Sequence, residues 1–231
     1  MSDAGASPFA AGAPAPRGSG DARSEILQRI RSALSDAPAV PAPLAVERPA
    51  REPDVELFVA RVADYRATVT PCGPSDDAVR EAIAAAFARH GARAIAVPHD
   101  FPAGCRPTDL MYYEEPADPR ALGALDGVLT TSALGIAETG TIVLDGGLGQ
   151  GARQLTLLPD LHVCVVDAST IVAGVAEATP LMRAAVARGG RPLTLISGPS
   201  ATSDIELDRV EGVHGPRRLE VVVRQEPEPG V

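Results

Sequence analysis

The spacing of apolar residues changes along the chain, and each change predicts an element. Residues 54–69 (DVELFVARVADYRATV) and 75–91 (SDDAVREAIAAAFARHG) carry apolar residues at helical spacing, which predicts two amphipathic helices. The second has Ser75 as an N-cap and Gly91 as a C-terminal stop. The apolar run 92–98 (ARAIAVP) that follows predicts a buried strand.

Strand-like and helical runs alternate further on. Short runs rich in Val, Ile, Leu and Thr predict strands at 127–132, 141–144, 162–166 and 193–197, and a helix is predicted at 178–190. This alternation predicts an α/β fold with a mixed, largely parallel sheet flanked by helices. The closely spaced runs between 127 and 166 indicate antiparallel hairpins.

The amino-terminal part has a different composition. Residues 1–22 are Ala, Pro, Gly and Ser with little to bury, which predicts a disordered tail. Residues 23–53 combine a short helix, 24–34 behind an N-cap at Ser24, with a Pro-rich tether. Residues 54–231 are then one α/β domain.

Charge and composition exclude several classes of function. The net charge of −9 and the pI of about 4.9 argue against nucleic acid or an anionic membrane surface as a partner. All 21 basic residues are Arg, so no lysine is available for a Schiff base or a Walker motif. The apolar runs are also too short for a membrane helix.

The cysteines and histidines predict no metal or cofactor in this chain. Cys72, Cys105 and Cys164 are far apart and form no C-x-x-C motif, so they cannot hold an iron–sulfur cluster and do not read as a disulfide framework. With no signal peptide, this predicts a cytoplasmic protein. No two of the four His residues stand at metal-ligand spacing.

A glycine-rich loop resembles a dinucleotide fingerprint only superficially. GLGQGA at 147–152 satisfies G-x-G-x-x-A, and Asp167 follows at about the right distance. However, the next residues, RQLTLLPD, are too short before Pro159 and too rich in strand formers to be the required helix. The sequence therefore favours a hairpin or a ligand-facing loop.

Two later stretches are candidates for a ligand site. SGPSATSDIE at 197–206 directly follows a predicted strand, where hydroxyls and backbone N–H groups could hold an anion; alternatively, Ser203 and Glu206 form a capping box. VHGPRRLEVVV at 213–223 places His214 and Arg217 at a turn before a terminal strand, and a purely structural role for His214 is the alternative.

These stretches, taken with two others, resemble a known family. GIAETGTIVL at 135–144, R-x-L-x-x-L-P from Arg153 to Pro159, ISGPSATSDIE and GVHGPR occur in the order and spacing typical of the lactate utilisation protein C family, whose core is the LUD domain. The resemblance implies a fold like those of ribose-5-phosphate isomerase, glucosamine-6-phosphate deaminase and the coenzyme A transferases. It also implies a non-redox subunit that assists two iron–sulfur partner proteins in oxidising L-lactate to pyruvate.

The resemblance also bears on Glu138. Ala137-Glu138-Thr139-Gly140 is similar to the stretch in which a glutamate of coenzyme A transferases attacks an acyl thioester. Partial burial would raise the pKa of Glu138 above about 4.3 and suit it to proton transfer. A buried Glu138 that only fixes its own loop is the structural alternative.

Three functions follow: a lactate-oxidation subunit that binds a small anionic ligand or organises partners, an acyl or coenzyme A transferase, and a small-anion sensor or scaffold. Glu138 is the catalytic candidate and is expected to share one pocket with Ser200, Asp204 and His214. The candidate ligand-binding residues are Thr139, Gly140, Arg153, Ser197, Gly198, Ser200, Thr202, Asp204, His214 and Arg217.

Overall fold

The structure is a computed structural model, and it forms two compact units, Met1–Glu47 and Arg48–Val231. The residues that it describes are 19–35, 51–115, 118–199, 201–202, 210–211 and 215–227. None of the helices in these ranges combines the length and the apolar composition that a membrane span requires.

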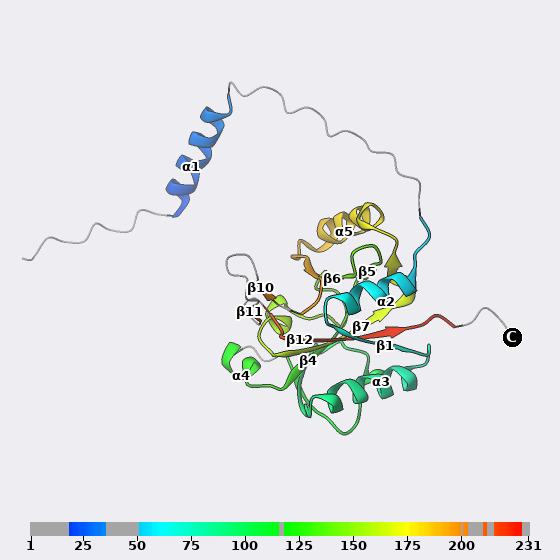
Figure 1. Cartoon of the computed structure of the whole chain (residues 1–231). Helices are drawn as coiled ribbons and strands as arrows, with labels where there is room; N and C mark the ends of the chain where they lie inside the picture. The colour runs from blue at the N-terminus through cyan, green and yellow to red at the C-terminus, as the bar shows by residue number, and fades with distance from the viewer. Residues whose placement is uncertain are drawn as a thin grey trace, which may run out of the picture. The chain divides into compact units, whose positions relative to one another are not determined.

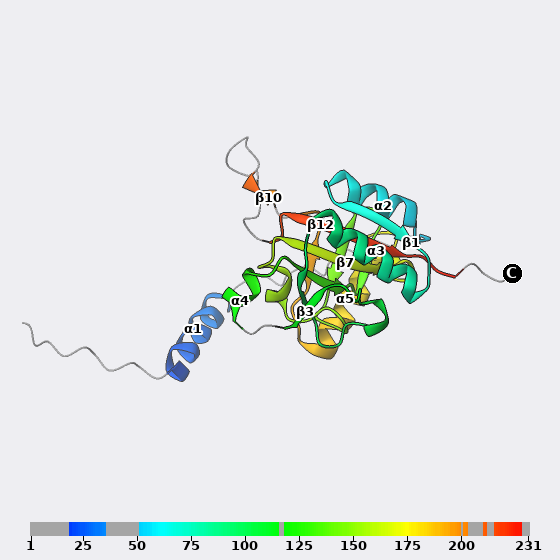
Figure 2. The same ribbon diagram turned by 90° about the horizontal axis from the view of Figure 1, so that it is seen from below.

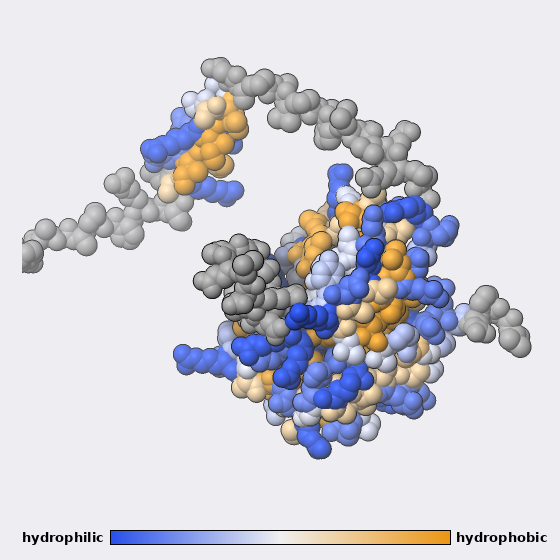
Figure 3. All heavy atoms as spheres, in the orientation of Figure 1, coloured by the Kyte–Doolittle hydropathy of each residue, from blue (hydrophilic) through white to orange (hydrophobic). Residues whose placement is uncertain are grey.

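The first unit contains one described helix, α1 (Ser19–Ala33). It begins five residues before the predicted start, so Ser24 lies inside the helix and not at its N-cap. The predicted tail, apart from residues 19–22, lies outside the described residues. Figure 3 shows an exposed apolar stripe along the helix, and Ile26, Leu27 and Ile30 of α1, with Leu34 just after it, are exposed.

The second unit is built on a six-stranded sheet of order β1-β12-β7-β4-β2-β3 (Figure 1). Every neighbouring pair in this sheet is parallel. The strands are β1 (Thr68–Cys72), β2 (Ala94–Val97), β3 (Met111–Glu114), β4 (Gly127–Thr131), β7 (Leu161–Asp167) and β12 (Arg218–Arg224). The predicted α/β class is therefore confirmed.

Helices α2 (Val55–Asp64) and α3 (Asp76–Arg89) cover opposite faces of this sheet (Figures 1 and 2). Side chains alternate along a strand, so in β12 Val222 packs with the α3 core, whereas Val221 and Val223 pack with the α2 core. Strands buried on both faces in this way explain the continuous apolar runs of the sequence.

The ends of α3 agree with the sequence. The Ser75 hydroxyl accepts the backbone N–H of Ala78 at 3.2 Å, and Gly91 follows the C-cap with φ +64°. The first predicted helix, in contrast, ends early. It stops at Asp64, and Arg66, with φ +67°, redirects the chain into β1, where a continued helix had been expected.

The antiparallel hairpin predicted between 127 and 166 belongs to a second sheet of order β8-β5-β6-β9, and all pairs of the main sheet are parallel. β5 (Leu134–Ile136) and β6 (Thr141–Leu144) form a hairpin, and β8 (Ile171–Val172) and β9 (Thr194–Ile196) complete the sheet. Helix α5 (Val175–Gly189) buries Ala178 against it.

The remaining elements are short. They are η1 (Ala103–Cys105), α4 (Pro119–Gly123), η2 (Arg153–Thr156), η3 (Ala168–Thr170), and the antiparallel pair β10 (Ala201–Thr202) and β11 (Val210–Glu211). Because η2 is a single 3₁₀ turn, the glycine-rich loop before it does not open the helix that a dinucleotide site requires.

Candidate functional site

Glu138 lies at the tip of the β5–β6 hairpin, and its side chain is exposed. It is 48% accessible, and its Oε2 lies 2.9 Å from Nη2 of Arg51. The side chain is therefore less buried than the sequence suggested. The hydrogen bond to Glu138 raises the pKa of Arg51, whose Nε also lies 3.7 Å from Oε1 of Glu177.

Gly174 leaves room for this ion pair because it has no side chain. Gly174 precedes α5, and a Cβ built there would collide with Nη2 of Arg51 and lie 2.5 Å from Oε2 of Glu138. The Glu138 backbone N–H also donates to the carbonyl of Ala173 at 3.0 Å. The position of Glu138 is thus set by the segment that joins β8 to α5.

The residues after Glu138 belong to a hydroxyl chain. Thr139 Oγ1 lies 2.7 Å from Thr141 Oγ1, which lies 2.8 Å from Ser197 Oγ. Gly140 has φ +57°, and a Cβ there would lie 2.6 Å from the carbonyl carbon of Arg61 in α2. This part of the turn is therefore packed against a helix.

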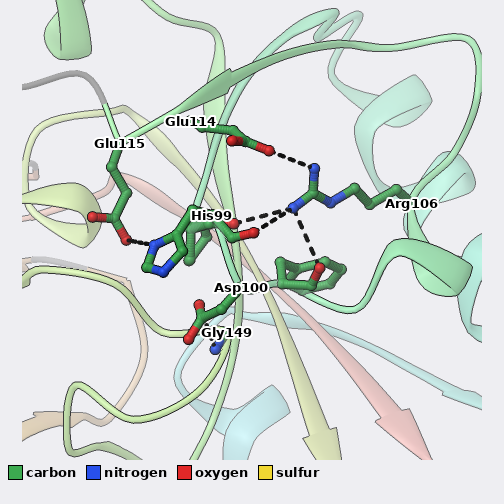
Figure 4. Close-up of polar contacts among 8 residues, drawn as sticks. His99, Asp100, Arg106, Glu114, Glu115 and Gly149 are labelled. Atoms are coloured by element: carbon green, nitrogen blue, oxygen red, sulfur yellow. Dashed lines mark hydrogen bonds and ion pairs between the residues drawn. The ribbon is translucent and has the colours of Figure 1, made fainter.

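A cavity of about 560 Å³ lies elsewhere, at the carboxyl ends of β2 and β3. This edge is the usual ligand-binding edge of an open α/β sheet. His99 and Asp100 follow β2 after Pro98, Glu115 comes directly after β3, and all three line the cavity. His99 Nδ1 lies 3.6 Å from Glu115 Oε1, and Asp100 Oδ1 accepts the Gly149 N–H at 2.9 Å (Figure 4).

Arg106 fixes the loop that carries His99 and Asp100. Its Nη2 donates to the carbonyls of Pro98 and Phe101 at 3.2 and 3.3 Å, and its Nη1 lies 3.1 Å from Oε1 of Glu114 (Figure 4). The guanidinium also lies over the ring of Tyr112, 5.7 Å from its centre. Arg106 thus connects the ends of β2 and β3.

The glycine-rich loop forms another wall. Thr131, at the end of β4, donates its N–H to Gly149 O and its hydroxyl to Leu148 O, both at 2.7 Å. Gly149 has φ +69°, and a Cβ there would lie 2.8 Å from the Thr131 side chain. Glycine permits both this backbone conformation and the close approach to β4.

The cavity is also lined by hydrogen-bond donors that have no acceptor within the described part of the chain. Arg153 and Arg191 line the cavity, and neither forms an ion pair with a described residue. Gln150 is only 5% exposed; its Oε1 accepts the Asp145 N–H at 2.7 Å, and its Nε2 has no acceptor among the described residues. These groups together suit an anion.

The predicted site residues are divided between two places. Pairing of Ile142 with Ile196 and of Leu144 with Thr194 sets Ser197 beside the Glu138 turn, and Leu144 and Thr194 beside the cavity. Glu138, Thr139, Gly140, Ser197 and Gly198 therefore lie at one end of the β6–β9 ladder, and Arg153 lies at the other.

The other predicted residues give less information. Arg217 is exposed before β12, with Nε 3.7 Å from Oδ1 of Asp160. Thr202 lies in β10, but its side chain is not described, and Ser200, Asp204 and His214 lie outside the described residues. The single pocket expected to contain three of these with Glu138 stays a prediction.

Most of the charged cavity residues carried no signal in the sequence. His99, Asp100, Glu115 and Arg191 belong to no motif of the sequence, whereas Gln150 lies in the glycine-rich loop at 147–152, for which a ligand-facing role was one of two interpretations. One signal was available, since His99 and Asp100 follow a predicted strand at a position where α/β folds bind ligands. Glu115 gave no such signal, because β3 was not predicted.

Burial disfavours the thiolate form of all three cysteines. Burial raises the pKa of Cys105 to about 11 and that of Cys164 to about 12, and it also raises that of Cys72. Within the described ranges, no group of three His, Cys, Asp or Glu side chains could hold a metal ion.

Comparisons with known proteins agree on one family. The model of the LUD domain matches residues 117–223. A Deinococcus radiodurans protein named lactate utilization protein C is 42% identical over 207 residues, which cover 88% of this chain and 95% of that protein. A Bacillus subtilis protein of the same name is 38% identical over 91 residues, which cover 38% of this chain and 38% of that protein. A crystal structure of a DUF162 family protein from Deinococcus radiodurans superposes with a TM-score of 0.62 at 40% identity, covering 74% of this chain and 95% of that one.

Proposed function

The chain belongs to the lactate utilization protein C family, as its motifs predicted, and we propose that it serves lactate utilisation by binding a small organic anion in the cavity at the ends of β2 and β3. The observation that carries this proposal is the pair of arginines, Arg153 and Arg191, that line the cavity without an ion-pair partner among the described residues.

A carboxylate would complete the hydrogen bonding of this wall. A guanidinium binds a carboxylate through two parallel N–H···O bonds, and the Gln150 amide adds a neutral donor beside the two charges. Because Gln150 is almost fully buried, its unused N–H group would lose little water on binding. A carboxylate such as that of lactate or pyruvate fits this chemistry.

We propose in addition that the chain is a non-redox subunit beside iron–sulfur partner proteins. Oxidation of lactate to pyruvate releases two electrons, which need an acceptor. Metal clusters are held by thiolates, and the raised pKa values of Cys72, Cys105 and Cys164 disfavour the thiolate form. This chemistry supports placing the electron acceptor in a partner.

The transferase alternative has weaker support. A nucleophilic Glu138 would need an acyl group held against it, whereas its carboxylate is paired with Arg51 and does not line the cavity. A sensor or scaffold without chemistry would use the same cavity, so binding alone does not separate it from the lactate role.

Growth and binding together test the proposal. Arg153→Gln and Arg191→Gln remove the charge and keep much of the length, and both side chains are exposed, so folding should survive. We expect the double variant to restore growth on L-lactate poorly in a strain that lacks the gene, and to bind L-lactate and pyruvate at least about tenfold more weakly in calorimetry.

Arg120→Gln is the matched control, because Arg120 is exposed on α4 and does not line the cavity. It should grow and bind like the unchanged protein. Full growth and unchanged binding of the double variant would reject the anion site. Co-purification of the tagged protein with two iron–sulfur proteins tests the partner proposal. If no iron–sulfur protein co-purifies from cells growing on lactate, the partner proposal is contradicted.

A further inference from the structure

We propose that the natural ligand of this cavity is larger than lactate: an organic anion with a carboxylate or phosphate at one end and several hydroxyl groups at the other. The inference rests on the proposed anion site and specifies its ligand class. Two observations carry it, namely the size of the cavity and the different chemistry of its two walls.

The cavity is too large for lactate alone. Lactate has six non-hydrogen atoms, and at roughly 30 Å³ for each, the share of a water molecule in the liquid, it fills about 180 Å³ at most. The cavity measures about 560 Å³. Bound small molecules usually have most of their surface covered by protein. Lactate would leave about two thirds of this space to water.

The lining residues differ in charge according to the segment that supplies them. Arg153, Arg191 and Gln150, here called the arginine wall, come from the 146–153 loop, η2 and the segment before β9, and all carry hydrogen-bond donors. Asp100, Glu115 and His99, here called the second wall, come from the ends of β2 and β3. Two carboxylates on this second wall would repel another anionic group, so a ligand that spans the cavity has its negative charge at the arginine wall only.

Hydroxyl groups suit the second wall best. Asp100 uses Oδ1 to accept the Gly149 N–H, and Glu115 Oε1 lies near His99, while Oδ2 and Oε2 have no donor among the described residues. A hydroxyl can donate to such a carboxylate oxygen and also accept from the His99 ring, whereas an ammonium group can only donate. A chain or ring with neighbouring hydroxyls could therefore use all three side chains.

Calorimetry with four probes tests the inference on the full chain. D-Gluconate carries a carboxylate and hydroxyls, D-glucose 6-phosphate a phosphate and hydroxyls, L-lactate a carboxylate and a single hydroxyl, and D-sorbitol hydroxyls alone. We expect at least one of the first two to bind at least about tenfold more tightly than L-lactate, and D-sorbitol to bind more weakly than that probe. The tighter of the first two identifies the anionic group.

Glu115→Gln separates this inference from the anion site itself. It should weaken the tighter hydroxylated anion several-fold but not weaken L-lactate, which loses only a repulsive charge, whereas Arg153→Gln should weaken every anion. L-Lactate binding as tightly as both larger anions, or an unchanged affinity for the tighter one in Glu115→Gln, would overturn the inference and leave the anion site standing. If no anion binds, both the inference and the site are rejected.

Discussion

Replacing Gly140 by Ala should destabilise the second unit much more than its small size suggests. Gly140 has φ +57°, a left-handed conformation that costs an alanine about 1 to 2 kcal/mol. The added Cβ would also lie 2.6 Å from the carbonyl carbon of Arg61 and 2.8 Å from the backbone N of Val62. These are backbone atoms of α2, which is anchored by the fully buried Phe58 and Val62 and cannot easily retreat.

The expected cost is the sum of the two effects. Overpacking of this kind costs about 1 to 3 kcal/mol, so the total is about 2 to 5 kcal/mol. For a domain of this size each kcal/mol lowers the melting midpoint by roughly 2 to 4 °C, and we expect a fall of about 10 °C. Gly91→Ala is the matched control, because Gly91 has φ +64° but nothing within 4 Å of the added Cβ. It should lose only about 2 to 8 °C, corresponding to the conformational cost.

Thermal melting of both purified variants, with urea unfolding as an independent measure, compares them directly. Equal midpoints for Gly140→Ala and Gly91→Ala would refute the packing argument. The ligand contact that the sequence suggested would then remain the explanation for a glycine at position 140.

Three further predictions concern charged groups. Burial lowers the pKa of His162 from 6.5 to about 4, so the unfolded state binds the proton more tightly than the folded state. The free energy of unfolding should therefore fall by about 3 kcal/mol from pH 6.5 to pH 4. In His162→Gln, the urea midpoint should depend less on pH than in the unchanged protein. Glu220 is 2% exposed and lies 2.5 Å from Nη2 of Arg89, so Glu220→Gln should cost about 1 to 3 kcal/mol in urea unfolding, and a cost below about 0.5 kcal/mol would contradict a structural pair. Glu138→Gln should leave the melting midpoint within error, since Glu138 and Arg51 are 48% and 46% exposed; unchanged folding with lost growth on L-lactate would support a functional Glu138, and normal growth would reject it.

Local patterns were enough for much of the fold. The helical spacing of 75–91 with its Ser75 cap, and the apolar runs that became β2, β4, β6, β7 and β12, are properties of neighbouring residues, so the sequence carries them directly. The family motifs are equally local. β1 and β3 were missed because these edge strands are short, contain no fully buried residue and include polar residues.

The site depended on contacts between distant segments. Glu138 has apolar neighbours in the sequence, yet its side chain is exposed. It pairs with Arg51 at the surface, and Gly174, which has no side chain, leaves room for that pair. His99 meets Glu115 because β2 and β3 pair in parallel with Val97 opposite Glu114, a register that no periodicity encodes. The sequence by itself therefore determined the family, the α/β class and most elements. The tertiary structure alone decided which side chains share a cavity, because strand order and register bring together residues that are not neighbours in the chain.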